Sequence, residues 1–284
     1  MEKRKVALVT GSSRGIGRGI AISLAKAGYD IAVHHSKSLE DAEKTESELK
    51  ALGANTCILQ GDTGESDVPS RIVKETIEKL GGLDVMVCNA GLTRFESLLD
   101  ITPEIMDLMY NVNYRGMILC AQAAAKYMVK EKIKGSILFN TSIRSYSQHH
   151  GDGVYGGLKA GLNRTIQSFA LELGRYGIRV NGFSPGVTVI SDRFSLFYKD
   201  TPRFIPLRRN GYPEDMGDVV VWLASDASSY VTGQVISVDG GLNTVGAPES
   251  YGDLVNLYDI EDWLDVDEEN VHKARLIKKT EKEK

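Results

Sequence analysis

The chain has 284 residues, of which 42% are hydrophobic, and a formal net charge of −4. This is the composition of a globular protein large enough to form one α/β domain around a sizeable core. The mild acidity argues against nucleic-acid and membrane-surface partners, which need a clustered basic surface, and no apolar run is long enough to cross a bilayer.

Short apolar runs alternate with longer helical patterns along most of the chain. The first run, residues 6–9, is too short for a signal peptide and predicts a buried strand. The predicted strands are residues 6–9, 31–33, 56–59, 85–87, 136–139, 179–183 and 235–238, and the helical segments include residues 15–27, 39–52, 69–80, 103–130 and 155–176. Continuous apolar strands interleaved with helices indicate a parallel sheet covered on both faces. We therefore expect an α/β fold with a Rossmann-type, doubly wound, seven-stranded parallel sheet in a single domain, residues 1–243.

The first predicted strand runs directly into the turn Thr10-Gly11-Ser12-Ser13-Arg14-Gly15-Ile16-Gly17. Without Cβ atoms, Gly11, Gly15 and Gly17 let the backbone turn sharply and approach a pyrophosphate, whose charge favours the N-terminus of the next helix. The turn alone could be only a tight connection. Its position between a predicted strand and a predicted helix favours a dinucleotide site.

The segment after the second strand bears on which dinucleotide binds. It reads His34-His35-Ser36-Lys37-Ser38, with no acid before Glu40. NAD-binding sites place an acid here for the ribose 2′-hydroxyl, and an acid would repel a 2′-phosphate. With Arg14 in the glycine turn, this segment favours NADP(H) over NAD(H), and His35, Ser36 and Lys37 become candidate cofactor contacts. The alternative for Lys37 and the two histidines is a plain solvated loop.

Ser142, Tyr155 and Lys159 form a candidate catalytic set. Tyr155 and Lys159 are four residues apart and share one face of a helix. Hydride addition to a ketone builds negative charge on its oxygen, so the site needs a donor to orient that oxygen and an acid to protonate it. We assign these roles to Ser142 and Tyr155. A neighbouring ammonium on Lys159 should lower the tyrosine pKa from about 10.

These motifs together resemble the short-chain dehydrogenase/reductase family, in its 3-oxoacyl-[acyl-carrier-protein] reductase-like or glucose dehydrogenase-like branch. The resemblance covers about residues 5–243 and rests on the glycine turn, Asn89-Ala90-Gly91, Asn113, Ser142, Tyr155/Lys159, Pro185-Gly186 and Asp239-Gly240-Gly241. It implies that Asn113 is catalytic and supports a water relay to Lys159, with Asn111 as the competing candidate. It also implies that Lys159 holds the nicotinamide ribose, and that the family forms homo-oligomers, here a tetramer or dimer.

The resemblance also implies further cofactor contacts. The full predicted set is Gly11, Ser13, Arg14, Gly15, Ile16, Gly17, His35, Ser36, Lys37, Asp62, Thr63, Asn89, Ala90, Gly91, Tyr155, Lys159, Pro185, Gly186 and Thr188. Asp62 matches the position that contacts adenine. Thr188 or Ser191 stands in for the usual threonine after Pro185-Gly186.

Three stretches depart from the pattern or lie outside it. Gly156-Gly157-Leu158 replace the usual small residues after Tyr155, and each glycine costs a helix roughly 1 kcal/mol relative to alanine. Residues 191–210 are aromatic and basic, and predict a mobile lid over a partly apolar substrate. Residues 244–284 form a charged C-terminal extension with apolar anchors, which we expect to dock in part.

Cys57, Cys88 and Cys120 are far apart and form no Cys-x-x-Cys pair, so we expect reduced thiols in a cytoplasmic protein and no metal site. The leading functional hypothesis is an NADPH-dependent carbonyl reductase or alcohol dehydrogenase acting on a small-molecule ketone or secondary alcohol, such as a 3-oxoacyl or steroid compound. The alternative is an NAD(P)+-dependent sugar, polyol or hydroxysteroid dehydrogenase. A third hypothesis is a non-catalytic nucleotide-binding scaffold that binds a partner through its tail.

Overall fold

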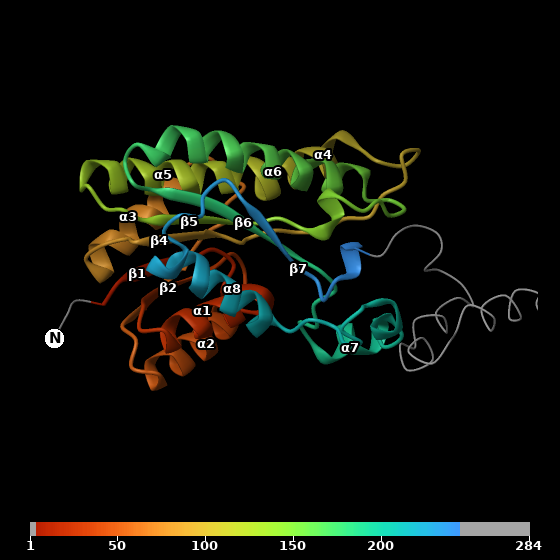
Figure 1. Ribbon diagram of the computed structural model, residues 1–284, viewed down its shortest axis with the longest axis horizontal. Helices are drawn as coiled ribbons and strands as arrows, with labels where there is room; N and C mark the ends of the chain where they lie inside the picture. The colour runs from red at the N-terminus through yellow and green to blue at the C-terminus, as the bar shows by residue number, and fades with distance from the viewer. Residues whose placement is uncertain (1–3, 245–284) are drawn as a thin grey trace, which may run out of the picture.

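The computed structural model describes residues 4–244, apart from the side chains of Arg193 and Phe197. A seven-stranded sheet lies at its centre, with helices on both faces (Figure 1). The strands are β1 (Val6–Val9), β2 (Asp30–His35), β3 (Thr56–Gln60), β4 (Val85–Cys88), β5 (Ser136–Asn140), β6 (Arg179–Pro185) and β7 (Val235–Val238). They run parallel in the order β3-β2-β1-β4-β5-β6-β7. The predicted doubly wound sheet is confirmed.

The helices form two layers. Figure 1 shows one layer of α3 (Val68–Leu80), α4 (Pro103–Tyr110), α5 (Met117–Lys130) and α6 (Gly153–Gly174). The opposite layer contains α1 (Gly15–Lys26), α2 (Leu39–Ala51) and α8 (Pro213–Ala224), and the short α7 (Asp192–Phe197) lies beyond the end of the sheet. The helix α8 is absent from the sequence-based segments. Its signals are Pro213 at the first helical positions and a capping box between Tyr212 and Asp215.

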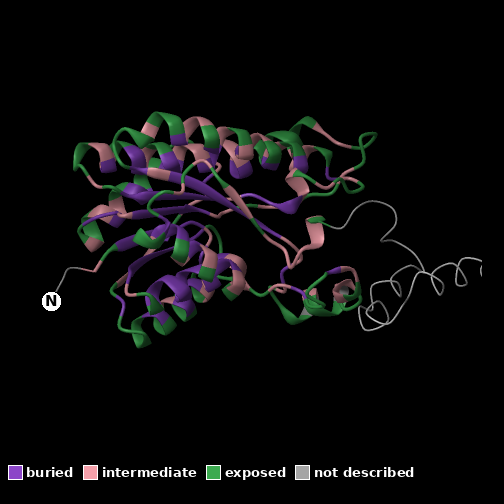
Figure 2. Cartoon of the chain, viewed as in Figure 1, coloured by how far each residue is buried: buried purple, intermediate pink, exposed green. Residues whose placement is uncertain are grey.

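Side-chain alternation along the strands produces two cores, one under each helical layer. In β1, Leu8 packs into the core beneath α3 and α5, whereas Ala7 and Val9 pack into the core beneath α1 and α8. Figure 2 shows the sheet buried along most of its length between the two layers. A strand buried on both faces is mostly apolar, which explains the nearly continuous apolar runs in the sequence.

The predicted helix at residues 103–130 is interrupted. Between α4 and α5 the chain forms a π-helix, η1 (Asn111–Gly116). Such π-turns are rare and occur frequently at functional sites. Asn113 lies in this turn and is fully buried.

The structure also bears on the expectations for the cysteines, for membrane-spanning helices and for the predicted lid. Cys57, Cys88 and Cys120 are free and buried. Over residues 4–244, no helix has both the length and the apolar character that a membrane crossing requires. The predicted lid contains α7 and a short 3₁₀ turn, Thr201–Phe204. The predicted docking of the C-terminal extension falls outside the described residues.

Candidate active site

The predicted site residues gather at the carboxyl ends of neighbouring strands. The glycine turn follows β1, Asn89 follows β4, Ser142 comes two residues after β5, and Pro185 ends β6. The strands β1, β4, β5 and β6 are adjacent in the sheet. Ligands of open parallel sheets bind at this edge. The sheet order therefore brings together motifs that are far apart in the sequence.

The glycine turn has the shape that a pyrophosphate requires. Gly11 and Gly15 adopt left-handed backbone angles, with φ of 66° and 57°. A Cβ on Gly17 would overlap the carbonyl oxygen of Gly11 and lie 2.5 Å from Asn89 Nδ2. The helix α1 begins at Gly15, its cap residue Arg14 makes no side-chain capping bond, and its first turn contains no acid. The first amides of a helix have no partner within it, so those at the start of α1 suit the phosphates of a dinucleotide.

A buried histidine, which the sequence reasoning did not single out, supports this turn. His34 Nδ1 accepts a hydrogen bond from Gly11 N at 3.0 Å, and Nε2 lies 3.1 Å from the Gly61 carbonyl oxygen. Burial lowers the pKa of His34 to about 4. The ring is therefore neutral at pH 7, and the two contacts assign its proton to Nε2. Two histidines at the end of a strand were the available signal, but only the fold reveals what they contact.

The residues predicted to recognise a 2′-phosphate separate into exposed and buried groups. Arg14, Ser36 and Lys37 are exposed beside the glycine turn, and Thr45 Oγ1 of α2 donates to the Ser13 carbonyl oxygen at 2.9 Å. His35 differs, because its side chain is buried and neither ring nitrogen has a hydrogen-bond partner in the described residues. Its ring lies inside the protein, away from the exposed Arg14, Ser36 and Lys37 side chains.

A chain of hydrogen bonds connects the glycine turn with Lys159. Asn89 Nδ2 donates to the Thr10 carbonyl oxygen at 2.8 Å, and Asn89 Oδ1 accepts from Asn140 Nδ2 at 2.8 Å. Lys159 Nζ donates to the Asn140 carbonyl oxygen at 2.7 Å. Asn140 was not predicted as a site residue. The structure assigns it a central position because it bridges β4 and the helix that carries Lys159.

Ser142, Tyr155 and Lys159 lie together as the spacing predicted. The Tyr155 side chain lies close enough to Ser142, and to Thr93, a residue that the sequence reasoning missed, for both to lower its pKa. Lys159 Nζ lies 5.7 Å from the centre of the Tyr155 ring. The Lys159 side chain is buried, and this burial lowers its pKa to about 7.

The expected lowering of the Tyr155 pKa is not what the structure gives. Burial raises the pKa of Tyr155, and this effect exceeds the lowering by the hydrogen bonds to Thr93 and Ser142 and by the charge of Arg144. Lys159 is not among the groups that shift it. The expectation counted the ammonium but omitted desolvation, which penalises the charged forms of both residues.

The other predicted residues occupy defined positions. Both amide atoms of Asn113 bind the backbone of Leu92, at 3.0 and 2.8 Å, so its side chain is committed there. Asn111 is only partly buried. Thr188 is buried and donates to the Gly186 carbonyl oxygen, whereas Ser191 caps α7. The water relay and the carboxamide contact stay predictions.

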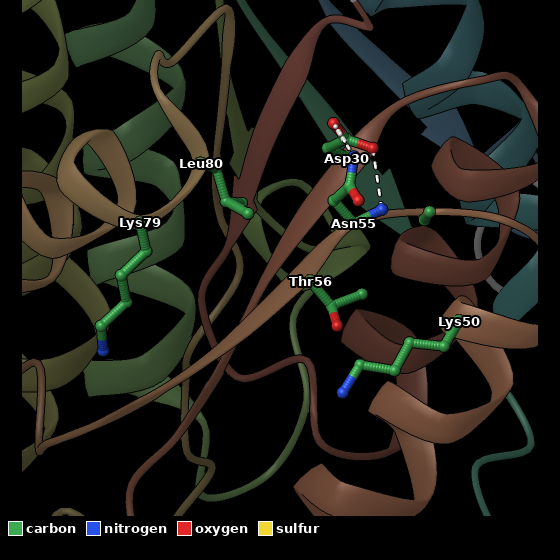
Figure 3. Close-up of a pocket in the computed structure, with 7 residues that line it drawn as sticks. Asp30, Lys50, Asn55, Thr56, Lys79 and Leu80 are labelled. Carbon is green, nitrogen blue, oxygen red and sulfur yellow. Dashed lines mark hydrogen bonds between the residues drawn. The ribbon is translucent and has the colours of Figure 1, made fainter.

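A separate pocket opens at the opposite edge of the sheet (Figure 3). It has a volume of about 460 Å³ and is lined by Asp30, Lys50, Ala54, Asn55, Thr56, Lys79 and Leu80. Asp30 is satisfied by Asn55 and by an ion pair with Arg4. This pocket lies at the amino ends of β2 and β3, whereas parallel sheets bind their ligands at the carboxyl ends of the strands. In the described range, acidic, histidine and cysteine side chains form no group that would hold a metal ion.

Comparisons with known proteins agree with this geometry. A family profile described as enoyl-(acyl carrier protein) reductase matches residues 11–243. The chain is 38% identical over 245 residues to the 3-oxoacyl-[acyl-carrier-protein] reductase FabG of Staphylococcus aureus, covering 85% of this chain and 99% of that protein. It is 36% identical to the L-rhamnose 1-dehydrogenase (NAD(P)(+)) of a Sphingomonas species, covering 84% and 96%. The crystal structure of a short-chain type dehydrogenase/reductase from Mycobacterium marinum superposes with a TM-score of 0.78 at 32% identity, covering 86% and 96%.

Proposed function

The chain belongs to the short-chain dehydrogenase/reductase family and is an NAD(P)-dependent oxidoreductase acting on CH–OH groups, and we propose that it works as an NADPH-dependent carbonyl reductase. The observation that supports this most directly is that Ser142 lies close enough to Tyr155 to lower its pKa, with buried Lys159 one helical turn from Tyr155. The FabG relative, named as a 3-oxoacyl reductase, supports the reductive direction.

In the proposed site, the glycine turn and the start of α1 would hold the cofactor phosphates. Arg14, Ser36 and Lys37 would meet the 2′-phosphate, as exposed donors on the edge next to the turn. Arginine and lysine are the residues best suited to a phosphate dianion. When bound, the nicotinamide supplies the hydride to a carbonyl carbon or accepts it from a secondary alcohol.

The protein's own groups would manage the proton. The Ser142 hydroxyl would orient the substrate oxygen by donating a hydrogen bond to it. Tyr155 would hold the proton at Oη and pass it to that oxygen as negative charge develops. Lys159, held by Asn140 at 2.7 Å, would stabilise the resulting phenolate when its amine is protonated. Because burial raises the pKa of Tyr155, the phenol keeps its proton at neutral pH. Burial lowers the pKa of Lys159 to about 7, so its amine exchanges its proton near neutral pH.

A titration of purified protein with NADPH and, separately, NADH tests this proposal. We expect tighter binding of NADPH, followed by NADPH consumption with ketones. The Arg14→Ala and Lys37→Ala variants should weaken NADPH binding and leave NADH binding unchanged. Lys26→Ala is the matched control, because Lys26 is exposed at the opposite end of α1. Equal losses for both cofactors would contradict the 2′-phosphate assignment, and binding of neither by folded protein would contradict the function.

The alternative, an NAD(P)+-dependent sugar or polyol dehydrogenase, is supported by the relative named as an L-rhamnose dehydrogenase. Faster oxidation of a sugar than reduction of any ketone at neutral pH would favour it. A dimer or tetramer stays a prediction. Exposed Leu171 on α6, with 85% of its surface accessible, offers an apolar contact for a second copy. Light scattering that finds only monomer would reject it.

A further inference from the structure

A charged pair stands beside the candidate catalytic tyrosine. Arg144 follows Ser142 by two residues, and Asp152 precedes Tyr155 by three, at the start of α6. Arg144 Nη1 donates to Asp152 Oδ2 at 3.3 Å. The exposed fractions of the two side chains are 18% and 7%. Both charges influence the pKa of Tyr155, Arg144 lowering it and Asp152 raising it. The pair therefore lies within electrostatic reach of the reacting phenol.

The residues around Tyr155 form two successive layers. Thr93 and Ser142 lie next to the phenol, where both lower its pKa. Two residues further along each loop, Phe95 and Arg144 contact one another, with the guanidinium carbon 5.8 Å from the ring centre. The backbone fixes this second layer, since Glu96 N donates to the Gly151 carbonyl oxygen at 2.9 Å. A substrate whose carbonyl oxygen reaches Tyr155 would thus meet Phe95 and Arg144 with its adjoining carbons.

The chemistry of the pair indicates what those carbons carry. An arginine has five N–H donors. Among the described residues, the Arg144 side chain donates one hydrogen bond, to Asp152. Asp152 Oδ1 accepts from His149 N at 3.2 Å, and a carboxylate has about four acceptor sites. The pair therefore offers donors and acceptors side by side. An apolar substrate would cover the exposed part of the pair without offering it a hydrogen bond, which is costly. An anionic substrate would be attracted to Arg144 but repelled by Asp152.

We propose that Arg144 and Asp152 determine specificity by binding the hydroxyl groups of a neutral, polyhydroxylated substrate beside the reacting carbon. Such hydroxyls both donate and accept hydrogen bonds, so they satisfy the carboxylate and the guanidinium at once. Phe95, 52% exposed, offers an apolar face to the C–H side of the same chain. This inference rests on the proposed function and narrows its substrate class to sugars, polyols and their ketones.

The proposal is tested by measuring NADPH consumption with three ketones of four carbons each. Erythrulose carries three hydroxyl groups, butan-2-one carries none, and acetoacetate is anionic. We expect erythrulose to be the preferred substrate of the wild-type enzyme. Arg144→Leu should lower kcat/KM for erythrulose at least tenfold relative to butan-2-one, mainly through KM. Asp152→Asn should lower erythrulose turnover and raise that of acetoacetate. The matched control is Arg94→Leu, which removes an exposed arginine next to Phe95 and should leave the ratios unchanged.

Several results would overturn the proposal. One is preference of the wild type for butan-2-one, and another is preference for acetoacetate that disappears in Arg144→Leu. A third is an equal loss for all three ketones in Arg144→Leu, which would show that the pair only positions Tyr155. An enzyme that binds NADPH but reduces no carbonyl compound would instead contradict the proposed function.

A binding measurement without turnover separates a wrong substrate assignment from a wrong proposed function. With NADPH present, erythritol and butane-1,4-diol cannot react, because both cofactor and alcohol are already reduced. Saturation-transfer NMR should detect erythritol on the wild type, a weaker signal with the diol, and loss of the erythritol signal in Arg144→Leu. Equal signals for the two alcohols, or an erythritol signal that survives the substitution, would contradict the assignment whether or not the enzyme turns over.

Discussion

The two glycines that follow Tyr155 are expected to respond oppositely to substitution by alanine. Both lie in α6, where alanine is favoured over glycine by about 1 kcal/mol. A Cβ on Gly157 would meet nothing within 4 Å, so Gly157→Ala should stabilise the protein by that amount. For a domain of this size, we expect the melting temperature to rise by about 2–4 °C.

Gly156 is buried against the turn that carries Ser142. A Cβ there would lie 2.8 Å from the Arg144 carbonyl oxygen, a backbone atom that cannot rotate away. Relief to an ordinary contact of 3.4 Å requires a shift of about 0.6 Å, from 3.4 minus 2.8. Overpacking of this kind costs about 1–3 kcal/mol, which cancels or exceeds the gain in helix propensity. We therefore expect Gly156→Ala to be about 1–3 kcal/mol less stable than Gly157→Ala.

The same displacement should reduce turnover. Ser142 Oγ accepts a hydrogen bond from Arg144 N at 3.1 Å, so a movement of Arg144 moves the hydroxyl predicted to orient the substrate. Misplacement approaching 1 Å can cost roughly a hundredfold, and a tenfold or larger loss in kcat/KM is expected for Gly156→Ala only. Thermal unfolding by circular dichroism and kinetics at saturating NADPH measure the two effects. Equal melting temperatures and equal activities for the two variants would refute the reasoning.

Three further predictions concern protonation and the cofactor turn. His34 has a pKa of about 4 in the folded protein against an ordinary value of 6.5, so the unfolded chain binds more protons between these pH values. The free energy of unfolding should therefore fall by about 3 kcal/mol as the pH drops from 6.5 to 4. Urea unfolding of the His34→Gln variant should show a smaller loss. Lys159 has a pKa of about 7 against an ordinary 10.5, so the cofactor-free protein should gain stability as the pH rises from 7 to 10.5; a Lys159→Met variant that keeps this gain would contradict the assignment. Asn89→Ala removes the donor to the Thr10 and Gly11 carbonyls and should weaken NADPH binding about tenfold, which calorimetry would measure, with unchanged affinity counting against the role of Asn89.

The central strands were predictable because β1 and β4 are buried at every residue and are apolar throughout. Runs 6–9 and 235–238 coincide with β1 and β7. The helix α8 was harder to predict, because its run Val219-Val220-Val221 has the β-branched character of a strand. Only the three-dimensional structure shows that this segment forms a helix and packs against α1. Local propensity could not decide between the two, and burial did.

That Ser142, Tyr155 and Lys159 lie together was predictable and their catalytic roles stay predictions, whereas their pKa shifts and neighbouring residues were not predictable. Ser142, Tyr155 and Lys159 could be identified from spacing, since i and i+4 share a helix face. The pKa shifts of Tyr155 and Lys159 depend on burial by the whole fold, which spacing does not encode. Thr93 reaches Tyr155 from a different loop, so only the three-dimensional arrangement could reveal it.

A chain of hydrogen bonds from Thr10 through Asn89 and Asn140 to Lys159 connects the glycine turn with the lysine that we propose to be catalytic. Each bond joins neighbours in the sheet order, from β1 to β4, from β4 to β5, and from β5 to α6. If a bound phosphate moved the glycine turn, we would therefore expect the Asn140 carbonyl, which accepts from Lys159, to move as well. Asn89 holds Asn140, and the Asn140 carbonyl holds the Lys159 amine, so we expect a change at the glycine turn to alter the position of this amine relative to Tyr155.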